Sequence, residues 1–277
     1  MSNVLHSALK EKNMNKLLKT TALACAMMLP QFAQAGLVTQ WEYEVASEWT
    51  GATYEATGDG LTSTTSSVLS WGAEGGSYDT APKNRSALVI SNSPKAGTDL
   101  VTNSMAYVLT NVITHFNNVL AGGTMSLKTA LLKTTLKLKP FLPVSGPALP
   151  AKELDFTIRF TETPNDANCG FDSDSNCDDI FVIEIGSLVN SFTYDGYKYT
   201  TSIIETTSSL TGLSPAACIE AGALPGCLGF KTVENAATDA QFGLLIDGVE
   251  VSEPAGTAAL GLGLLSLFMY GRRRAGK

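Results

Sequence analysis

Residues 132–139 read Leu-Lys-Thr-Thr-Leu-Lys-Leu-Lys, and residues 154–161 read Leu-Asp-Phe-Thr-Ile-Arg-Phe-Thr. In both stretches mostly apolar side chains alternate with polar or charged ones. Because successive side chains of a β-strand point to opposite faces, this period of two predicts two strands, each with one buried and one solvated face. Residues 140–150 contain four prolines, so we expect them to form a loop between these strands within one domain.

Other parts of the chain predict further strands and no convincing amphipathic helix. Residues 180–185 are mostly apolar, as expected of a central strand. Asp195-Gly196, between aromatic flanks, predicts the type I′ turn of a hairpin over residues 192–199. Residues 242–251 predict a closing strand with a turn at Asp247-Gly248. Together these patterns predict an all-β fold, an antiparallel β-sandwich of jelly-roll type.

The first 35 residues have the three parts of a secretory signal peptide. Lys10, Lys12, Lys16 and Lys19 precede an uncharged run over residues 20–29, and the small-x-small pattern of residues 33–35 predicts cleavage after Ala35. The apolar run is too short for a membrane span, which needs about 20 residues. We therefore expect residues 1–35 to form a signal helix that signal peptidase removes.

The last 26 residues, 252–277, form a second signal-like segment. Ser252-Glu253-Pro254 leads into an uncharged run over residues 255–270, and Arg272, Arg273 and Arg274 follow it. This order resembles a PEP-CTERM sorting signal, in which the usual Pro-Glu-Pro is here Ser-Glu-Pro. The resemblance implies an apolar helix that associates transiently with the inner membrane, arginines on the cytoplasmic side. It also implies removal of the tail by an exosortase and delivery to the cell surface or exterior of a Gram-negative bacterium.

Residues 36–251 make up the body, and their number suits one β-sandwich domain. Acidic residues outnumber basic ones in it by more than two to one. This charge argues against nucleic acid and against anionic lipid as partners, because both need positive charge on the protein. It is compatible with secretion and with the binding of cations.

Four cysteines follow the predicted signal peptide, and an even number in an exported chain predicts disulfides. Four cysteines allow three pairings. The short separations favour the two local pairs, Cys169 with Cys177 and Cys218 with Cys227. A four-cysteine zinc site is the alternative, although these spacings are wider than those of a zinc ribbon.

Thr114-His115-Phe116-Asn117 is a T-H-x-N tetrapeptide, and other short motifs surround it in a fixed order. They are Ser70-Trp71-Gly72, the stretch from Phe160 to Asn165, Cys169, the stretch from Cys177 to Phe181, Cys218, and the stretch from Cys227 to Thr232. This series, followed by the sorting tail, resembles the THxN family of PEP-CTERM proteins. The resemblance implies a surface-directed or secreted protein of exopolysaccharide-producing bacteria and implies no particular activity.

His115 is the only histidine after residue 35, so a site built from several histidines is excluded. No Gly-x-Ser-x-Gly motif accompanies it, which argues against a serine hydrolase of the common type. Our first interpretation is structural: His115 and Asn117 lie on one strand face and bond neighbouring backbone. Contact with a ligand and a catalytic role are the alternatives.

Residues 172–179 are the most acidic stretch of the body. Asp172, Asp174, Asn176 and Asp178 alternate like positions 1, 3, 5 and 7 of a calcium-binding loop. Cys177 replaces the turn glycine of an EF-hand and Ile183 replaces its last ligand, so an EF-hand is excluded. A disulfide-framed calcium loop remains one hypothesis, and a solvated acidic loop is the other.

Two further arrangements bear on carbohydrate chemistry. Glu162 with Asp178 or Asp179 would supply the carboxylate pair of a glycosidase. Trp41, Trp49 and Trp71 form either a platform for sugar rings or part of the core. The sequence thus predicts a non-catalytic structural or adhesive domain of the extracellular matrix, associated with exopolysaccharide. A calcium-dependent carbohydrate-binding module is the alternative, followed by a secreted hydrolase.

Overall fold

The computed structural model describes residues 36–164, 168–184 and 189–251. The predicted signal helix, Ala35, the apolar tail helix, Glu253, Pro254 and Arg272 to Arg274 lie outside these ranges. The chain divides into two units, Met1–Gly36 and Leu37–Lys277, and every element below belongs to the second. The described part of the chain contains no helix that combines the length and the apolar character needed to span a membrane.

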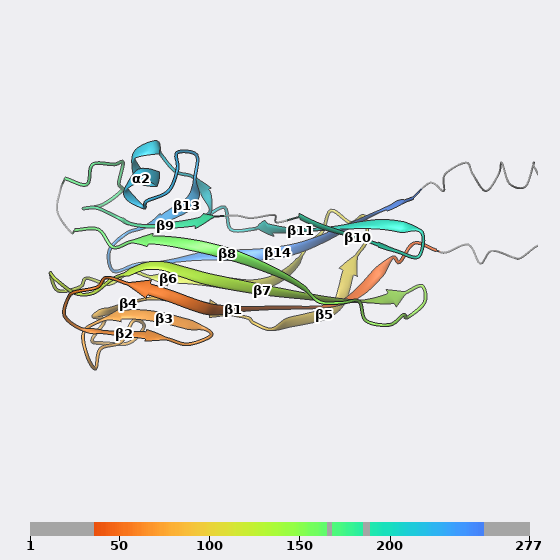
Figure 1. Ribbon diagram of the computed structural model, residues 1–277, viewed down its shortest axis with the longest axis horizontal. Coiled ribbons are helices and arrows are strands. Elements are labelled where there is room, and N and C mark those ends of the chain that lie inside the picture. Colours follow the sequence, from red (N-terminus) through yellow and green to blue (C-terminus); the bar gives the residue numbers. More distant parts are fainter. Residues whose placement is uncertain (1–35, 165–167, 185–188, 252–277) are drawn as a thin grey trace, which may run out of the picture. The chain divides into compact units, whose positions relative to one another are not determined.

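Two seven-stranded sheets make up the fold, and all their strand pairs are antiparallel (Figure 1). The first sheet has the order β12 (Thr211–Gly212), β13 (Leu228–Thr232), β9 (Asp179–Glu184), β8 (Lys152–Thr161), β7 (Leu127–Leu142), β1 (Gln40–Tyr54) and β5 (Lys95–Val101). The second has the order β10 (Val189–Tyr194), β11 (Tyr197–Glu205), β14 (Ala237–Glu250), β6 (Val108–Phe116), β4 (Arg85–Ser91), β3 (Val68–Gly72) and β2 (Leu61–Thr64). The predicted all-β antiparallel sandwich is confirmed.

The period-two stretches form neighbouring strands, β7 and β8. The loop between them is shorter than predicted, because β7 continues through Pro140 to Leu142. Their inward side chains are buried between the sheets: Leu132, Leu136, Leu138, Phe156, Ile158 and Phe160. The outward lysines of β7 each pair with a glutamate of β1: Lys133 with Glu48, Lys137 with Glu44, and Lys139 with Glu42. Alternation therefore separates an apolar inner face from a charged outer face, as the sequence predicts.

All three tryptophans of the chain lie in the core. Trp49 and Trp71 pack in one apolar cluster, and Trp41 packs in a second cluster with Tyr199. Trp41 and Trp71 are 0% exposed and Trp49 is 4% exposed. The core interpretation of these residues is correct, and the sugar-stacking platform is wrong, because none of the three rings presents a face to solvent.

One of the two predicted turns is present. Asp195 (φ 50°) and Gly196 (φ 78°) join β10 to β11, with Tyr194 directly opposite Tyr197, as a type I′ hairpin requires. The turn predicted at Asp247-Gly248 is wrong, because β14 runs through both positions. Gly248 is required for packing and not for a turn, because a Cβ at this position would clash with the side chains of Leu37, Thr102 and Tyr199.

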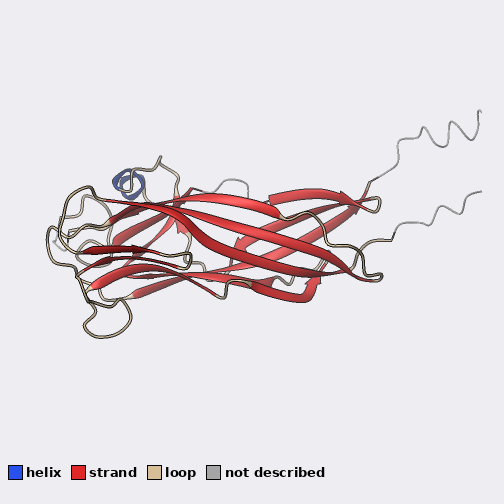
Figure 2. Cartoon of the chain, turned by 60° about the horizontal axis from the view of Figure 1, so that its bottom comes forward, coloured by secondary structure: helices blue, strands red, loops and turns tan. Residues whose placement is uncertain are grey.

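The structure adds one short helix that the sequence does not predict, α2 (Pro215–Glu220), which is drawn in blue in Figure 2. The Ser214 side chain caps it by accepting a hydrogen bond from the Ala217 amide. Its apolar face packs on Ile180 and Val182, which explains why β9 is apolar on both faces. Both local disulfides are present: Cys218–Cys227, which ties α2 to the start of β13, and Cys169–Cys177.

Candidate functional site: a buried acidic cluster

Three carboxyl groups converge where strands of the first sheet end. Glu162 directly follows β8, Asp179 is the first residue of β9, and Glu234 lies in the turn between β13 and β14. The antiparallel pairing places Thr232 opposite Asp179, so the turn after β13 comes close to the start of β9. One carboxylate oxygen from each of the three residues lies within 4.8 Å of the other two. We call these three residues the acidic cluster.

Fixed hydrogen bonds orient two of these carboxyl groups. The indole Nε1 of Trp71 donates to Oε2 of Glu162 at 2.7 Å. The backbone amide of Thr163 donates to Oδ1 of Asp179 at 2.9 Å, and the Thr163 hydroxyl donates to the Cys177 carbonyl at 2.6 Å. The second oxygen of Asp179, Oδ2, is buried and accepts no N–H or hydroxyl of the described residues. A hydrogen bond between the Asp179 and Glu162 carboxyls, which needs a proton on one of them, acts to lower the pKa of Glu162.

His115, on β6, faces the cluster from the second sheet. Its ring lies among Phe160, Trp71 and Phe230, with centroids 4.9, 6.2 and 6.5 Å away. The side chain is 0% exposed, and Nε2 lies 3.9 Å from Oδ2 of Asp179, too far for a hydrogen bond. Burial lowers the pKa of the imidazole to about 3, so the ring is neutral. Neither ring nitrogen has a hydrogen-bond partner within the described ranges.

The other residues of the T-H-x-N motif take different places. Asn117 donates from Nδ2 to the Thr232 carbonyl at 2.8 Å, as the structural interpretation of this residue predicts. His115 makes no such backbone bond, which departs from that interpretation. Thr114 lies on the outer face of β6, where its hydroxyl donates to Asp239 at 2.6 Å. The side-chain oxygen Oδ1 of Asn117 and the Thr232 hydroxyl are also buried without a hydrogen-bond partner among the described residues.

The environment opposes ionisation of the cluster. Burial is the main cause that raises the pKa of Glu162 to about 8, and the charges of Glu234 and Glu55 add to it, against the hydrogen bond from Trp71. Burial also raises the pKa of Asp179 well above its ordinary value, with the charges of Glu162 and Glu234 as further causes. Neighbouring carboxylates thus oppose the ionisation of both groups. At neutral pH, three carboxyls in this position therefore need protons or a cation.

The predicted calcium loop is arranged differently. Asp178 is buried, and its Oδ2 accepts the amide hydrogen of Asp174 at 2.8 Å. The carboxylate of Asp172 pairs with Lys231 at 3.2 Å, while the side chains of Asp172, Asp174 and Asn176 are exposed. Within the described part of the chain, the acidic cluster is the one trio of such ligand atoms that lies within 4.8 Å. Calcium binding by residues 172–178 stays a prediction.

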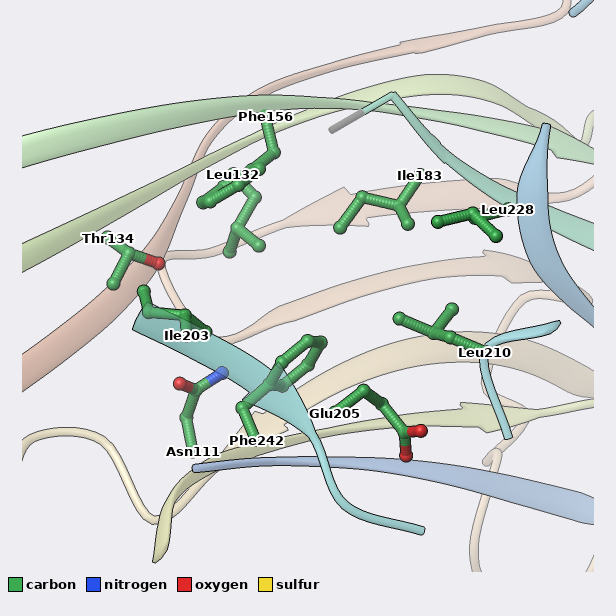
Figure 3. A pocket seen from close by; sticks show the side chains of 10 residues that line it. All are labelled: Asn111, Leu132, Thr134, Phe156, Ile183, Ile203, Glu205, Leu210, Leu228 and Phe242. Atoms are coloured by element: carbon green, nitrogen blue, oxygen red, sulfur yellow. The ribbon is translucent and has the colours of Figure 1, made fainter. Parts of the chain in front are cut away.

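A second feature is an apolar pocket of about 180 Å³ between the sheets (Figure 3). Leu132, Phe156 and Ile183 reach into it from the first sheet, and Ile203 and Phe242 from the second. Asn111, Thr134 and Glu205 supply its polar groups, and Leu210 and Leu228 complete the lining. The pocket suits a small apolar group and offers no pair of groups for acid–base chemistry.

Comparison with known proteins gives no assignment: no family model matches the chain, and no curated protein matches it. The resemblance to the THxN family therefore stays an expectation.

The motif series nevertheless has a structural counterpart. Five of its residues lie in or beside the acidic cluster although they come from separate parts of the chain: Trp71, His115 and Asp179 lie on three different strands, and Asn117 and Glu162 directly follow two strand ends. Sequence reasoning treated Glu162 and Asp179 only as a glycosidase pair and did not connect either with His115. Glu234 was missed entirely, since no motif includes it and one glutamate in a turn carries no signal.

Proposed function

We propose that this chain is an exported, surface-directed β-sandwich protein with a structural or adhesive, non-catalytic role in the extracellular matrix, associated with exopolysaccharide. The predicted signal peptide and sorting tail supply the route, through signal peptidase and an exosortase. Two disulfides in the body fit the oxidising environment that such a route leads to.

The observation that carries the non-catalytic part is the burial of His115. A general base needs access to the substrate and a pKa near the working pH. His115 is 0% exposed, and its pKa is lowered to about 3. No serine hydroxyl of the described residues bonds its ring. These features argue against the secreted hydrolase.

Two features of the sequence favour the alternative, a calcium-dependent carbohydrate-binding module: a tryptophan platform and an acidic loop. Its tryptophan platform is absent, because Trp41, Trp49 and Trp71 are all buried. Its acidic loop, residues 172–178, remains exposed at three of the four predicted ligand positions. The structural or adhesive role is therefore the better supported of the two.

The test uses protein secreted by an exosortase-bearing host. The mature protein should co-sediment with the extracellular polysaccharide of that host and should release no sugar from it. Binding to a glycan array, measured in calcium and in EDTA, separates the adhesive role from a calcium-dependent module. Hydrolysis of a glycan or an ester that His115→Gln abolishes would contradict the proposal.

A further inference from the structure

We propose that Glu162, Asp179 and Glu234 bind one divalent cation of the class that prefers oxygen ligands, with His115 facing the same point. This inference is independent of the proposed function, because it concerns how the fold is held together and not where the protein is delivered. It places a metal site in the interior at the strand ends and not in the exposed acidic loop.

The distances among the ligand atoms match a coordination sphere. Ligand oxygens of Ca²⁺ lie about 2.3–2.6 Å from the ion, so two of them can be at most about 5 Å apart. The three carboxylate oxygens of the cluster satisfy this limit, since they all lie within 4.8 Å of one another. An ion about 2.4 Å from both Asp179 Oδ2 and His115 Nε2, which are 3.9 Å apart, would see them at an angle of about 109°. Each of these separations is therefore short enough for the two ligand atoms to share one ion.

His115 is the second and independent observation. Buried polar atoms are nearly always paired, yet both nitrogens of this fully buried ring lack a hydrogen-bond partner among the described residues. The ring is neutral, so it carries a lone pair and no charge that would repel a cation. Nε2 can ligate the ion directly or accept a hydrogen bond from a water that the ion holds. Either contact explains why the sequence places an imidazole here.

The negative charge of the acidic cluster also favours a bound cation. The three carboxylates lie within 4.8 Å of one another, and the charges of neighbouring carboxylates act to raise the pKa values of Glu162 and Asp179. A divalent cation would offset the mutual repulsion of the cluster, which protons offset in its absence. Two further oxygen atoms could enlarge the coordination number. The Thr232 hydroxyl is on the residue paired with Asp179, and the side-chain oxygen Oδ1 of Asn117 belongs to the amide whose Nδ2 donates to the Thr232 carbonyl.

The site would join parts of both sheets. Glu162 and Asp179 belong to the ends of β8 and β9 in the first sheet, while His115 is on β6 in the second. Glu234 lies in the turn through which β13 of the first sheet continues into β14 of the second. A bound ion would therefore fasten the two sheets together at this end and raise the stability of the folded state.

Trp71 offers a direct probe, since its indole nitrogen lies 2.7 Å from a carboxylate oxygen of Glu162. Terbium, Tb³⁺, prefers oxygen ligands as calcium does, and an indole this close sensitises its luminescence. The full mature protein, treated with EDTA, should give saturable Tb³⁺ emission on tryptophan excitation, and Ca²⁺ or Mn²⁺ should displace it. Glu162→Gln or Asp179→Asn should weaken Tb³⁺ binding by about tenfold or more. The matched control, Asp172→Asn with Asp174→Asn, should leave it unchanged.

Thermal unfolding gives a second readout, which begins with the wild-type protein. Ca²⁺ or Mn²⁺ at about a hundredfold excess over its Kd should raise the Tm of the EDTA-treated wild-type protein by about 5–10 °C. His115→Gln should reduce the effect of Mn²⁺ more than that of Ca²⁺ if the ring ligates the ion directly, because imidazole suits transition metals better. An equal effect on both ions assigns the ring to a metal-held water.

Two results would overturn the inference. One is an unchanged Tm with Ca²⁺, Mn²⁺ and Mg²⁺, with no Tb³⁺ emission. The other is a shift that the Asp172 and Asp174 double variant removes and Glu162→Gln retains, which assigns the ion to the exposed loop. A shift with Zn²⁺ alone would overturn the class of cation. If Glu162→Gln fails to fold, the wild-type titrations and elemental analysis of the secreted protein decide the question.

Discussion

At the scale of single residues, Trp71 and Trp49 form a natural comparison. Both pack in the same apolar cluster and both are buried. The Trp71 indole N–H donates to Glu162, whereas the Trp49 indole N–H has no hydrogen-bond partner among the described residues. The two side chains thus bury similar apolar areas and differ in what their one polar atom does.

We expect Trp71→Phe to lower the free energy of unfolding more than Trp49→Phe does. The first removes a hydrogen bond to a buried carboxyl group, worth about 1.5–3 kcal/mol, in addition to the effect of the smaller ring. The second removes an unpaired buried donor, which offsets part of its packing loss. Urea unfolding of the two variants measures the difference, and equal losses would show that the bond to Glu162 contributes nothing.

At the scale of elements, β9 is enclosed on every side. β8 and β13 pair with its two edges, the opposite sheet covers one face, and α2 covers the other. The approach of β13 is especially close at Gly229, where a Cβ would overlap the carbonyl oxygen of Phe181. Only glycine fits there, and the tight contact fixes the register that sets Thr232 against Asp179.

Gly229→Ala should therefore destabilise the protein by about 1–3 kcal/mol, as overpacking in a core does. Gly212→Ala in the neighbouring strand β12 is the matched control, since a Cβ there meets nothing within 4 Å. The control should be neutral or slightly stabilising, because alanine reduces the freedom of the unfolded chain. Equal midpoints of urea unfolding for the two variants would contradict the steric account.

The disulfide Cys218–Cys227, which ties α2 to the start of β13, can be tested separately. Replacing Cys218 and Cys227 together by serine removes the cross-link of a short loop, which we expect to cost about 2.5 kcal/mol. Since α2 covers the outer face of β9, amide hydrogen exchange should accelerate over residues 215–221 and at Ile180 and Val182. Replacing Cys169 and Cys177 instead should leave exchange in α2 unchanged. Faster exchange in α2 in both double variants would contradict this prediction, because it would show that the effect on α2 is not specific to the Cys218–Cys227 disulfide.

At the scale of the whole molecule, the fold was predictable and the site was not. The alternation of apolar and polar residues in β7 and β8 can be read from neighbouring residues alone, and it predicts a strand with one buried face. The acidic cluster is non-local: Glu162 and Glu234 are far apart in sequence and meet because β8, β9 and β13 are neighbours. Sequence reasoning followed the local density of charge to residues 172–178 instead. Similarly, α2 was missed because six residues are too few to show a helical period.

Processing is a prediction for the entire chain. Protein secreted by an exosortase-bearing host should lack residues 1–35 and the apolar tail that begins near Ser252. Intact-mass analysis measures both losses at once, and a host without exosortase is the control, in which the tail should remain. Secreted protein that still carries Arg272 to Arg274 would contradict the sorting hypothesis.

The position of β14 has a mechanical consequence. This strand ends at Glu250, next to the last described residue. Its residues 242–250 pair with β11 on one side, and its residues 237–244 pair with β6 on the other. A force applied beyond Val251 along the strand axis would load these two ladders in shear, so that many hydrogen bonds must break together and not one after another. A sandwich held from this end would resist pulling far better than one held by an edge strand such as β2, which can be peeled from its single neighbour.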